Sequence, residues 1–147
     1  QRIACYLAND GEIDPGQLIE HAWLMNKAVY LPILAPFRQS LYFAPYRADS
    51  RMKLNRFRIP EPVCHPSEWI SARQLDLLLL PLVAFDPTGN RVGMGGGFYD
   101  RTLAGVNGPL RVGLAYDCQK VEGILPEPCD VPMDYVVTEL TVNDCRG

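Results

Sequence analysis

The segment LDLLLLPLVAF, residues 75–85, decides the fold class. It is an almost continuous apolar run, of the kind expected for a strand that is buried on both faces of a sheet. Pro81 lacks an amide hydrogen, so it must interrupt this strand or place it at an edge. The run is much shorter than the roughly 20 apolar residues of a membrane-spanning helix. It therefore predicts a buried strand rather than a membrane segment.

Strand and helix signals alternate on both sides of this segment. Asp14 and Pro15 are typical of a helix N-cap and a first helical position, and Leu18, Ile19 and Ala22 give that helix one apolar face. Further strands are predicted at residues 2–7, 27–34, 41–44, 110–115, 135–138 and 140–142, with a second helix at 98–103. Residues 45–74 are rich in proline and lack periodicity, so we expect mostly loop there. The alternation predicts an α/β fold with a mostly parallel central sheet flanked by helices, a Rossmann-like three-layer single domain.

Length and composition are those of an ordinary globular domain. The chain has 147 residues, 48% of them hydrophobic and 21% charged, whereas disordered chains are poorer in apolar residues. The formal net charge of −3 argues against binding to duplex nucleic acid, because such domains are usually basic. The five cysteines include no C-x-x-C pair, which argues against a zinc site or a disulfide framework and favours a reducing compartment. We therefore expect a cytoplasmic protein with no nucleic-acid or membrane partner.

Positive charge is concentrated between residues 38 and 58. This stretch carries five arginines and one lysine against a single acid, Asp49. Such a cluster is either a solvated loop surface or a basic rim for a polyanionic ligand, such as nucleotide phosphates or a carboxylate tail. Both interpretations stay open at this stage.

The strongest chemical signal is NRVGMGGGFYDR, residues 90–101, in which four of the five residues 93–97 are glycines. Glycines let backbone N–H groups approach one anion closely, and the helix predicted to follow adds a partial positive charge, so the loop predicts a phosphate site. Arg91 is placed to add a charge-assisted contact, and Asp100 to hold Mg²⁺ against the phosphates. Neither the P-loop nor the G-x-G-x-x-G pattern fits, because Phe98 and Tyr99 follow the glycines. The structural alternative is a tight turn whose aspartate only stabilises the helix N-terminus.

Taken in order, these blocks resemble the 5-formyltetrahydrofolate cyclo-ligase family, also called 5,10-methenyltetrahydrofolate synthetases. The resemblance rests on EID at 12–14, NRFRIPEP at 55–62, PLVAFD at 81–86, the glycine block at 90–101, LP at 125–126, and Asp130 followed by DYVVTE at 134–139. It covers nearly the whole chain, and the glycine block is its most specific part.

The resemblance implies an enzyme that uses ATP and Mg²⁺ to close the N5-formyl group of 5-formyltetrahydrofolate onto N10, with release of ADP and phosphate. No protein nucleophile is implied, so the protein would act by positioning and electrostatics. The implied ATP contacts are Arg91, Val92, Gly93, Met94, Gly95, Gly96, Gly97, Phe98 and Tyr99. The implied folate contacts are Leu7, Glu12, Phe57, Met94, Gly95, Gly96, Gly97 and Phe98. Asp100 and Asp130 match the magnesium-linked aspartates, and Arg91 and Asp100 are the implied catalytic residues.

Two of the folate positions also have simpler interpretations. A carboxylate such as Glu12 can accept paired N–H bonds from an aminopyrimidine ring, but it is equally a solvent-exposed loop acid. Phe57 matches an aromatic residue that packs on the folate, although by itself a phenylalanine more often belongs to a core.

The family has a preceding helical segment whose lysine and arginine side chains reach the ATP phosphates. We expect residues 1–147 to form a single cyclo-ligase-like domain that lacks this segment, and to be a monomer. Cys129 stands where the family often has histidine, and Phe98 where it often has tyrosine. Two alternative functions are a non-catalytic nucleotide- or folate-binding module, and an enzyme like the sugar-phosphate isomerases or CoA-transferases. The latter would need a catalytic glutamate or acid–base pair against the phosphate loop, and the sequence displays no such pair.

Overall fold

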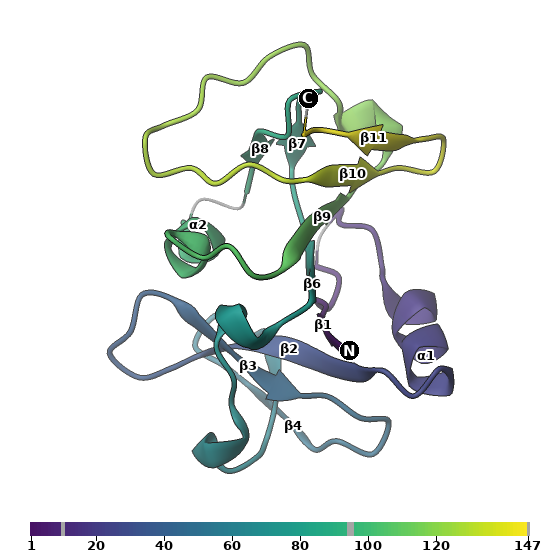
Figure 1. Ribbon diagram of the computed structural model, residues 1–147. Coiled ribbons are helices and arrows are strands. Elements are labelled where there is room, and N and C mark those ends of the chain that lie inside the picture. The colour runs from purple at the N-terminus through teal and green to yellow at the C-terminus, as the bar shows by residue number, and fades with distance from the viewer. Residues whose placement is uncertain (10, 94–95, 147) are drawn as a thin grey trace.

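The computed structural model describes residues 1–9, 11–93 and 96–146, which fold around one seven-stranded sheet (Figure 1). The strands of this sheet are β1 (Arg2–Ala4), β2 (Ala28–Leu34), β3 (Leu41–Pro45), β6 (Leu77–Leu80), β9 (Leu110–Leu114), β10 (Tyr135–Val137) and β11 (Val142–Asp144). Two small hairpins pair β4 (Met52–Leu54) with β5 (Pro60–Pro62) and β7 (Ala84–Phe85) with β8 (Arg91–Val92). The helices are α1 (Gly16–Leu24) and α2 (Phe98–Leu103), with 3₁₀ turns at Pro66–Glu68, Ala72–Gln74 and Asp117–Gln119.

The sheet has the order β11-β10-β9-β6-β1-β2-β3 and is parallel except at its two edges. In register, Ile3 of β1 lies opposite Val29 of β2 on one side and Leu77 of β6 on the other. The chain passes from β1 to β2 in one direction, whereas β6 leads to β9 and β10 in the other. The order of the strands therefore reverses between β1 and β6, and ligands of open α/β sheets bind at the carboxyl ends of the strands at such a point.

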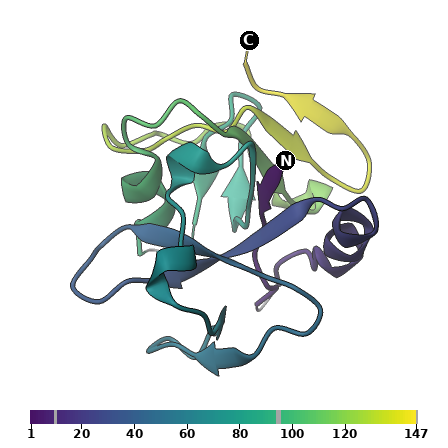
Figure 2. The ribbon, with the colours of Figure 1, turned by 60° about the horizontal axis from the view of Figure 1, so that its bottom comes forward.

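Alternate residues of the central strands fill two separate cores, one on each face of the sheet. Ile3, Val29 and Leu79 pack with Ile19 and Ala22 of α1 on one face. Ala4, Tyr30, Leu78 and Leu80 face the other cluster, which includes Leu103 of α2. Figure 2 shows α1 at the right of the crossing strands, whereas α2 and the turns Pro66–Glu68 and Ala72–Gln74 lie to the left. The mostly parallel α/β architecture predicted from the sequence is thus confirmed.

The apolar segment 75–85 is divided at Pro81, as its missing amide requires. Leu78, Leu79 and Leu80 are each no more than 2% exposed, which confirms a strand buried on both faces. After Pro81 the chain leaves the sheet and forms β7, which pairs with β8 rather than with a strand of the main sheet. The helix Phe98–Leu103 has the predicted bounds.

Other predicted bounds were wrong in detail. Helix α1 begins at Gly16, one residue later than expected, because the Asp14 carboxylate accepts a hydrogen bond from the Gly16 amide at 2.8 Å and Pro15 occupies the cap. Residues 45–74, predicted to be mostly loop, contain the β4–β5 hairpin, whose prolines concealed it. The last strand lies at Val142–Asp144 instead of 140–142, since residues 138–141 form the turn before it.

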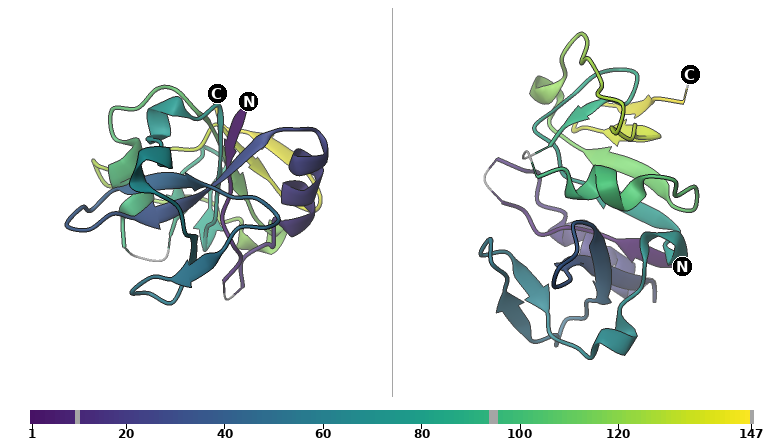
Figure 3. Two further views of the ribbon diagram at one scale, coloured as in Figure 1. Left: turned by 90° about the horizontal axis from the view of Figure 1, so that it is seen from below. Right: turned by 90° about the vertical axis from the view of Figure 1, so that its left-hand side faces the viewer.

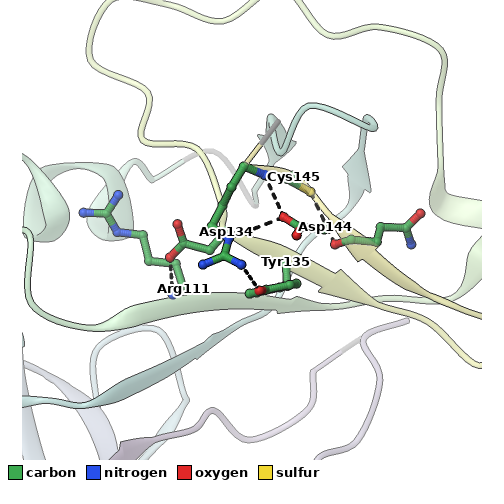
Figure 4. A network of polar contacts seen from close by, with 7 residues as sticks. Arg111, Asp134, Tyr135, Asp144 and Cys145 are labelled. Atoms are coloured by element: carbon green, nitrogen blue, oxygen red, sulfur yellow. Dashed lines mark hydrogen bonds and ion pairs between the residues drawn. The ribbon is translucent and has the colours of Figure 1, made fainter.

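The C-terminal edge of the sheet is closed by a polar network (Figure 4). The Asp134 carboxylate accepts from the Arg111 amide at 2.8 Å, and the Asp134 carbonyl accepts from the Cys145 amide at 2.9 Å. Arg146 donates to the Tyr135 hydroxyl and contacts Asp144 at 3.4 Å. These residues lie where β9 and β10 start, so the network fastens the end of the strands opposite to the carboxyl edge.

Candidate active site

The carboxyl ends of β1 and β6 collect the residues for which the sequence predicts chemistry. The loop after β1 carries Glu12, and the segment after β6 leads through β7 and β8 to the glycine loop and α2. Figure 3 (right) shows the loop after β1 and the tip of the β4–β5 hairpin on the same side of the molecule. This is the point of strand-order reversal, where the topology predicts a ligand site.

A buried carboxylate builds the turn that enters the site. Asp86 is 3% exposed, and its Oδ1 accepts from the amides of Thr88 and Asn90 and from the Thr88 hydroxyl at 2.8–3.0 Å. Its Oδ2 accepts from the Asn90 side chain at 3.0 Å and the Ile124 amide at 2.9 Å. Burial alone would raise the pKa of Asp86, but these hydrogen bonds outweigh it and hold the pKa below its usual value. The Asp86 carboxylate, ionised at neutral pH, therefore ties the β7–β8 turn to the distant 124 segment.

Arg91 follows this turn at the start of β8. Its Nη1 donates to the Pro81 carbonyl at 3.2 Å, and its guanidinium lies 5.4 Å from the centroid of the Tyr99 ring. One side chain thus joins the end of β6 to the first turn of α2, with a cation–π contact on the tyrosine. The guanidinium also lies beside Gly93, the first glycine of the loop for which the sequence predicts a phosphate.

The glycine loop is fastened by an arginine that follows it. Arg101 donates from Nη2 to the Gly96 carbonyl and from Nε to the Gln39 carbonyl, both at 2.7 Å, and it lies 4.9 Å from the Phe98 ring centroid. Gly97, the N-cap of α2, has a left-handed φ of +68°, which disfavours any residue with a Cβ. Met94 and Gly95, both predicted ligand contacts, lie outside the described residues.

A second group of polar side chains approaches the start of α2 from the loop after β1. Burial raises the pKa of the Tyr99 hydroxyl, which Arg91 counteracts and the Glu12 carboxylate reinforces. Burial also raises the pKa of Tyr6, whose hydroxyl donates to the Ile13 carbonyl at 2.7 Å, and Glu12 and Tyr99 raise it further. Glu12, Tyr6 and Tyr99 are therefore close enough to act on one another electrostatically.

Glu12 is half-buried rather than a fully solvated loop acid. Its Oε1 accepts from the Asn9 amide at 2.8 Å, and burial raises its pKa although that hydrogen bond lowers it in part. Leu7, the other position predicted near the pterin, packs at the margin of the α1-side core. The structure thus brings Glu12 within electrostatic range of Tyr99, and Leu7, in the same loop, is partly buried.

Phe57 reaches Phe98, the residue of α2 that follows the glycine loop, from a part of the chain predicted to be irregular. It lies at the tip of the β4–β5 hairpin, is 54% exposed, and contacts the Phe98 ring edge-on with 6.0 Å between centroids. An exposed phenylalanine on a loop is not a core residue, so the core interpretation of Phe57 is wrong. Two aromatic positions predicted to contact the folate are adjacent in space although they are far apart in sequence.

Asp100 and Asp130 are also brought together. The Asp100 Oδ1 accepts from the amide of Val131, the residue after Asp130, at 3.1 Å, and the Asp130 Oδ2 accepts from the Glu127 amide at 2.9 Å. Each carboxylate has a second oxygen, and hard anionic oxygens are the ligands that Mg²⁺ prefers, so this pair fits magnesium. In the part of the chain that the structure describes, no three His, Cys, Asp or Glu residues gather into a metal set. Magnesium held here would therefore take its remaining ligands from phosphate and water.

A surface cavity of about 390 Å³ lies apart from these residues. It is lined by Ala35, Pro36, Arg38, Tyr42, Pro66 and Trp69. Arg38 of the basic stretch lies 6.0 Å from the Tyr42 ring centroid, and Arg56 lies 5.0 Å from that of Phe57. The basic stretch is therefore divided between this cavity and the hairpin tip, and only Arg56 of these two arginines is next to a predicted site residue.

Comparison with known proteins identifies the family. The model of the 5-formyltetrahydrofolate cyclo-ligase family matches residues 1–139. The chain belongs to this family. A 5-formyltetrahydrofolate cyclo-ligase of Haemophilus influenzae is 48% identical over 136 residues, which cover 90% of this chain and 73% of the relative. The cyclo-ligase of Escherichia coli K12 is 45% identical over 139 residues, covering 92% and 76%.

A solved structure of the same family has the same fold. The 5,10-methenyltetrahydrofolate synthetase of Aquifex aeolicus superposes with a TM-score of 0.83 at 33% identity, covering all of this chain and 73% of the other. The match extends over every element of the sheet described above. The mostly parallel sheet with its two antiparallel edges is therefore a cyclo-ligase fold.

Several residues that shape this cyclo-ligase site make long-range contacts for which the sequence has no local signal. Asp86 belongs to a D-P-T-G-N turn, which predicts the contacts to Thr88 and Asn90 but not the one to Ile124. No sequence pattern predicts the contact of Arg101 with Gln39, which lies 62 positions away. The same is true of Glu61, which accepts a hydrogen bond from the Leu34 amide at the end of β2. All three contacts join segments that only the folded sheet brings together.

Proposed function

We propose that the protein catalyses the ATP-dependent cyclisation of 5-formyltetrahydrofolate to 5,10-methenyltetrahydrofolate. The observation that carries the proposal is the family match over residues 1–139. It is supported by the convergence of Glu12, Arg91 and Phe57 on the glycine loop and α2. In this reaction the formyl oxygen takes the γ-phosphoryl group from ATP and ADP leaves. N10 then attacks the formyl carbon, loses its proton, and the oxygen departs with phosphate.

In the proposed complex, the backbone of the glycine loop and Arg91 receive the ATP phosphates. The guanidinium already lies at the mouth of the loop, so it needs little rearrangement to neutralise the charge that develops on the transferred phosphoryl group. Arg101 holds the Gly96 carbonyl at 2.7 Å and so fixes this end of the loop, whose amides would face the ligand. These residues position the reactants, and the reaction requires no covalent intermediate with the protein.

Glu12 and Phe57 are proposed to hold the folate. The half-buried Glu12 carboxylate suits the paired N–H donors of an aminopyrimidine ring, and such charge-assisted pairs are both strong and directional. Phe57 and Phe98 offer aromatic surface to the rest of the ring system. Leu7, partly buried in the same loop as Glu12, would contribute apolar contact to the pterin.

Asp100 and Asp130 would hold Mg²⁺ together with the phosphate oxygens. When bound, this ion neutralises phosphate charge and keeps the γ-phosphoryl group in line with the attacking oxygen. Asp100 is anchored through the Val131 amide, so the two aspartates approach the phosphates from α2 and from the 127–131 turn.

A spectrophotometric assay for the methenyl product tests the proposal. The full-length protein with 5-formyltetrahydrofolate, ATP and Mg²⁺ should produce an absorbance rise that is lost without ATP, and Arg91→Ala should reduce it strongly. A matched control is Arg73→Ala, since Arg73 is an exposed residue of a 3₁₀ turn. Absence of product under all conditions would refute the cyclisation, and binding of both ligands without turnover would instead support the non-catalytic module.

We also propose a cytoplasmic location. All five cysteines lie within the described residues, and each is a free thiol, as expected in a reducing compartment. Among the helices of the described residues, none is long and apolar enough to span a membrane. A fluorescent fusion located by microscopy together with cell fractionation tests the location.

A further inference from the structure

We infer that Glu61 and Asn55 are positioning residues, which hold the turn at residues 55–59 so that Phe57 stays against Phe98, at the start of α2 after the glycine loop. This inference rests on the proposed function, because it assigns to the turn the task of presenting Phe57 to the folate. The β4–β5 hairpin can form few ladder hydrogen bonds. Two of the three residues of β5 are prolines, Pro60 and Pro62, which cannot donate to the β ladder. A hairpin of this length is marginal even with a full ladder, so other bonds must hold it.

Glu61 supplies the bond to the main sheet. Its Oε2 accepts from the backbone amide of Leu34, the last residue of β2, at 2.8 Å. The same oxygen accepts from the Asn55 Nδ2 at 2.9 Å. One carboxylate oxygen thus joins the carboxyl end of β2 to the start of the 55–59 turn. A hydrogen bond to a charged acceptor is among the stronger ones in proteins.

Asn55 shapes the turn from within. Its Oδ1 accepts from the amides of Phe57 at 2.8 Å and Ile59 at 3.2 Å, and its backbone carbonyl accepts from the Arg58 amide at 2.9 Å. Arg58 adopts a left-handed φ of +62°, which a residue with a side chain seldom adopts without such support. The Asn55 side chain is therefore bonded on both sides, to the turn through Oδ1 and to Glu61 through Nδ2.

Together these hydrogen bonds fix the position of the Phe57 ring. Phe57 is 54% exposed, so little packing of its own holds it, yet its ring lies edge-on to Phe98 at 6.0 Å. Phe98 in turn is contacted by Arg101, which fastens the glycine loop. The chain of contacts from β2 through Glu61, Asn55 and Phe57 to Phe98 makes the hairpin one wall of the site.

The geometry predicts an unusual pattern of substitutions at Glu61. A single oxygen accepts both hydrogen bonds, and the amide oxygen of glutamine also has two lone pairs, so Glu61→Gln should keep both. Glu61→Ala removes the acceptor and should weaken 5-formyltetrahydrofolate binding about threefold or more, approaching the loss caused by Phe57→Ala. Glu68→Ala is the matched control, because Glu68 is an exposed acid in the same region.

The decisive measurement is a double-mutant cycle on the dissociation constant of 5-formyltetrahydrofolate, measured by calorimetry without turnover. If Glu61 acts through Phe57, Glu61→Ala should add no more than about a factor of two in the Phe57→Ala background. Effects that multiply would overturn the inference. So would a Glu61→Gln protein as weak as Glu61→Ala, since the charge rather than the geometry would then matter. Asn55→Ala provides a second variant in case Glu61→Ala does not fold.

Limited trypsin digestion tests the positioning without any ligand. Trypsin cleaves after Arg56 and Arg58, so loosening of the turn in Glu61→Ala or Asn55→Ala should accelerate cleavage there relative to the unaltered protein and Glu68→Ala. Unchanged cleavage would refute the role of both residues. Failure of the proposed function appears separately, as the absence of methenyl product from the unaltered protein, and the digestion remains decisive in that case.

Discussion

Replacement of Asp86 by asparagine should destabilise the protein far more than an ordinary loop substitution. In the native turn, Oδ1 accepts three hydrogen bonds and Oδ2 accepts two, from Asn90 and Ile124. If the asparagine NH₂ group takes the place of Oδ2, its hydrogens face the two donors from Asn90 and Ile124. If the amide is rotated by about 180°, the NH₂ group instead faces the three donors that Oδ1 accepts in the native turn. Losing two bonds to a charged acceptor, at about 1.5–3 kcal/mol each, lowers the free energy of unfolding by about 3–6 kcal/mol.

Urea denaturation at neutral pH measures this loss, with Asp49→Asn as a control that removes an exposed loop charge and should change stability by less than about 0.5 kcal/mol. In a thermal scan, Asp86→Asn should lower Tm by at least about 6 °C, from about 2–4 °C per kcal/mol for a domain of this size. Because the folded pKa of Asp86 is depressed, its contribution is complete above the unfolded pKa of about 3.9 and is lost as the pH falls through the folded value. The difference between the two proteins should therefore shrink in acid. A loss below about 1 kcal/mol at neutral pH would refute the reasoning.

Three further substitutions test the site itself. Glu12→Gln should weaken folate binding by about tenfold with ATP binding unchanged, since it removes a charged acceptor, whereas equal weakening of both ligands would indicate misfolding. Burial raises the pKa of Glu12, so this carboxylate becomes protonated earlier than an ordinary one as the pH falls. Folate binding should therefore begin to weaken at a higher pH during acidification. Asp100→Asn should fold normally, need more Mg²⁺ and turn over slowly; a normal rate and magnesium dependence would reduce Asp100 to a dipole partner contributing about 0.3–1 kcal/mol. Arg101→Lys should raise the KM for ATP by about tenfold, since one ammonium group cannot replace the guanidinium at both the Gly96 and Gln39 carbonyls, and an unchanged KM would contradict that role.

The elements that the sequence predicted well are those whose signal is local. The leucines at 77–80 needed burial on both faces, Pro81 had to end the strand, and the glycines at 93–97 had to precede a helix rather than lie within one. The β4–β5 hairpin escaped prediction because Pro60 and Pro62 are usually breakers of strands. Side-chain bonds of Glu61 and Asn55 supplement the few backbone bonds of this hairpin, and no propensity scale includes them.

The candidate site divides in the same way. The sequence by itself determined the glycine loop, the arginine at its mouth and the carboxylate in the following turn, because these lie within twelve consecutive residues. Only the tertiary structure decided that Glu12 approaches Tyr99, that Phe57 meets Phe98 and that Asp100 is bonded to the residue after Asp130. The physical reason is that a local pattern depends on steric and hydrogen-bonding preferences of neighbouring residues. Contacts across about 30 to 90 positions exist only once the reversal of strand order between β1 and β6 has brought the loops to one edge of the sheet.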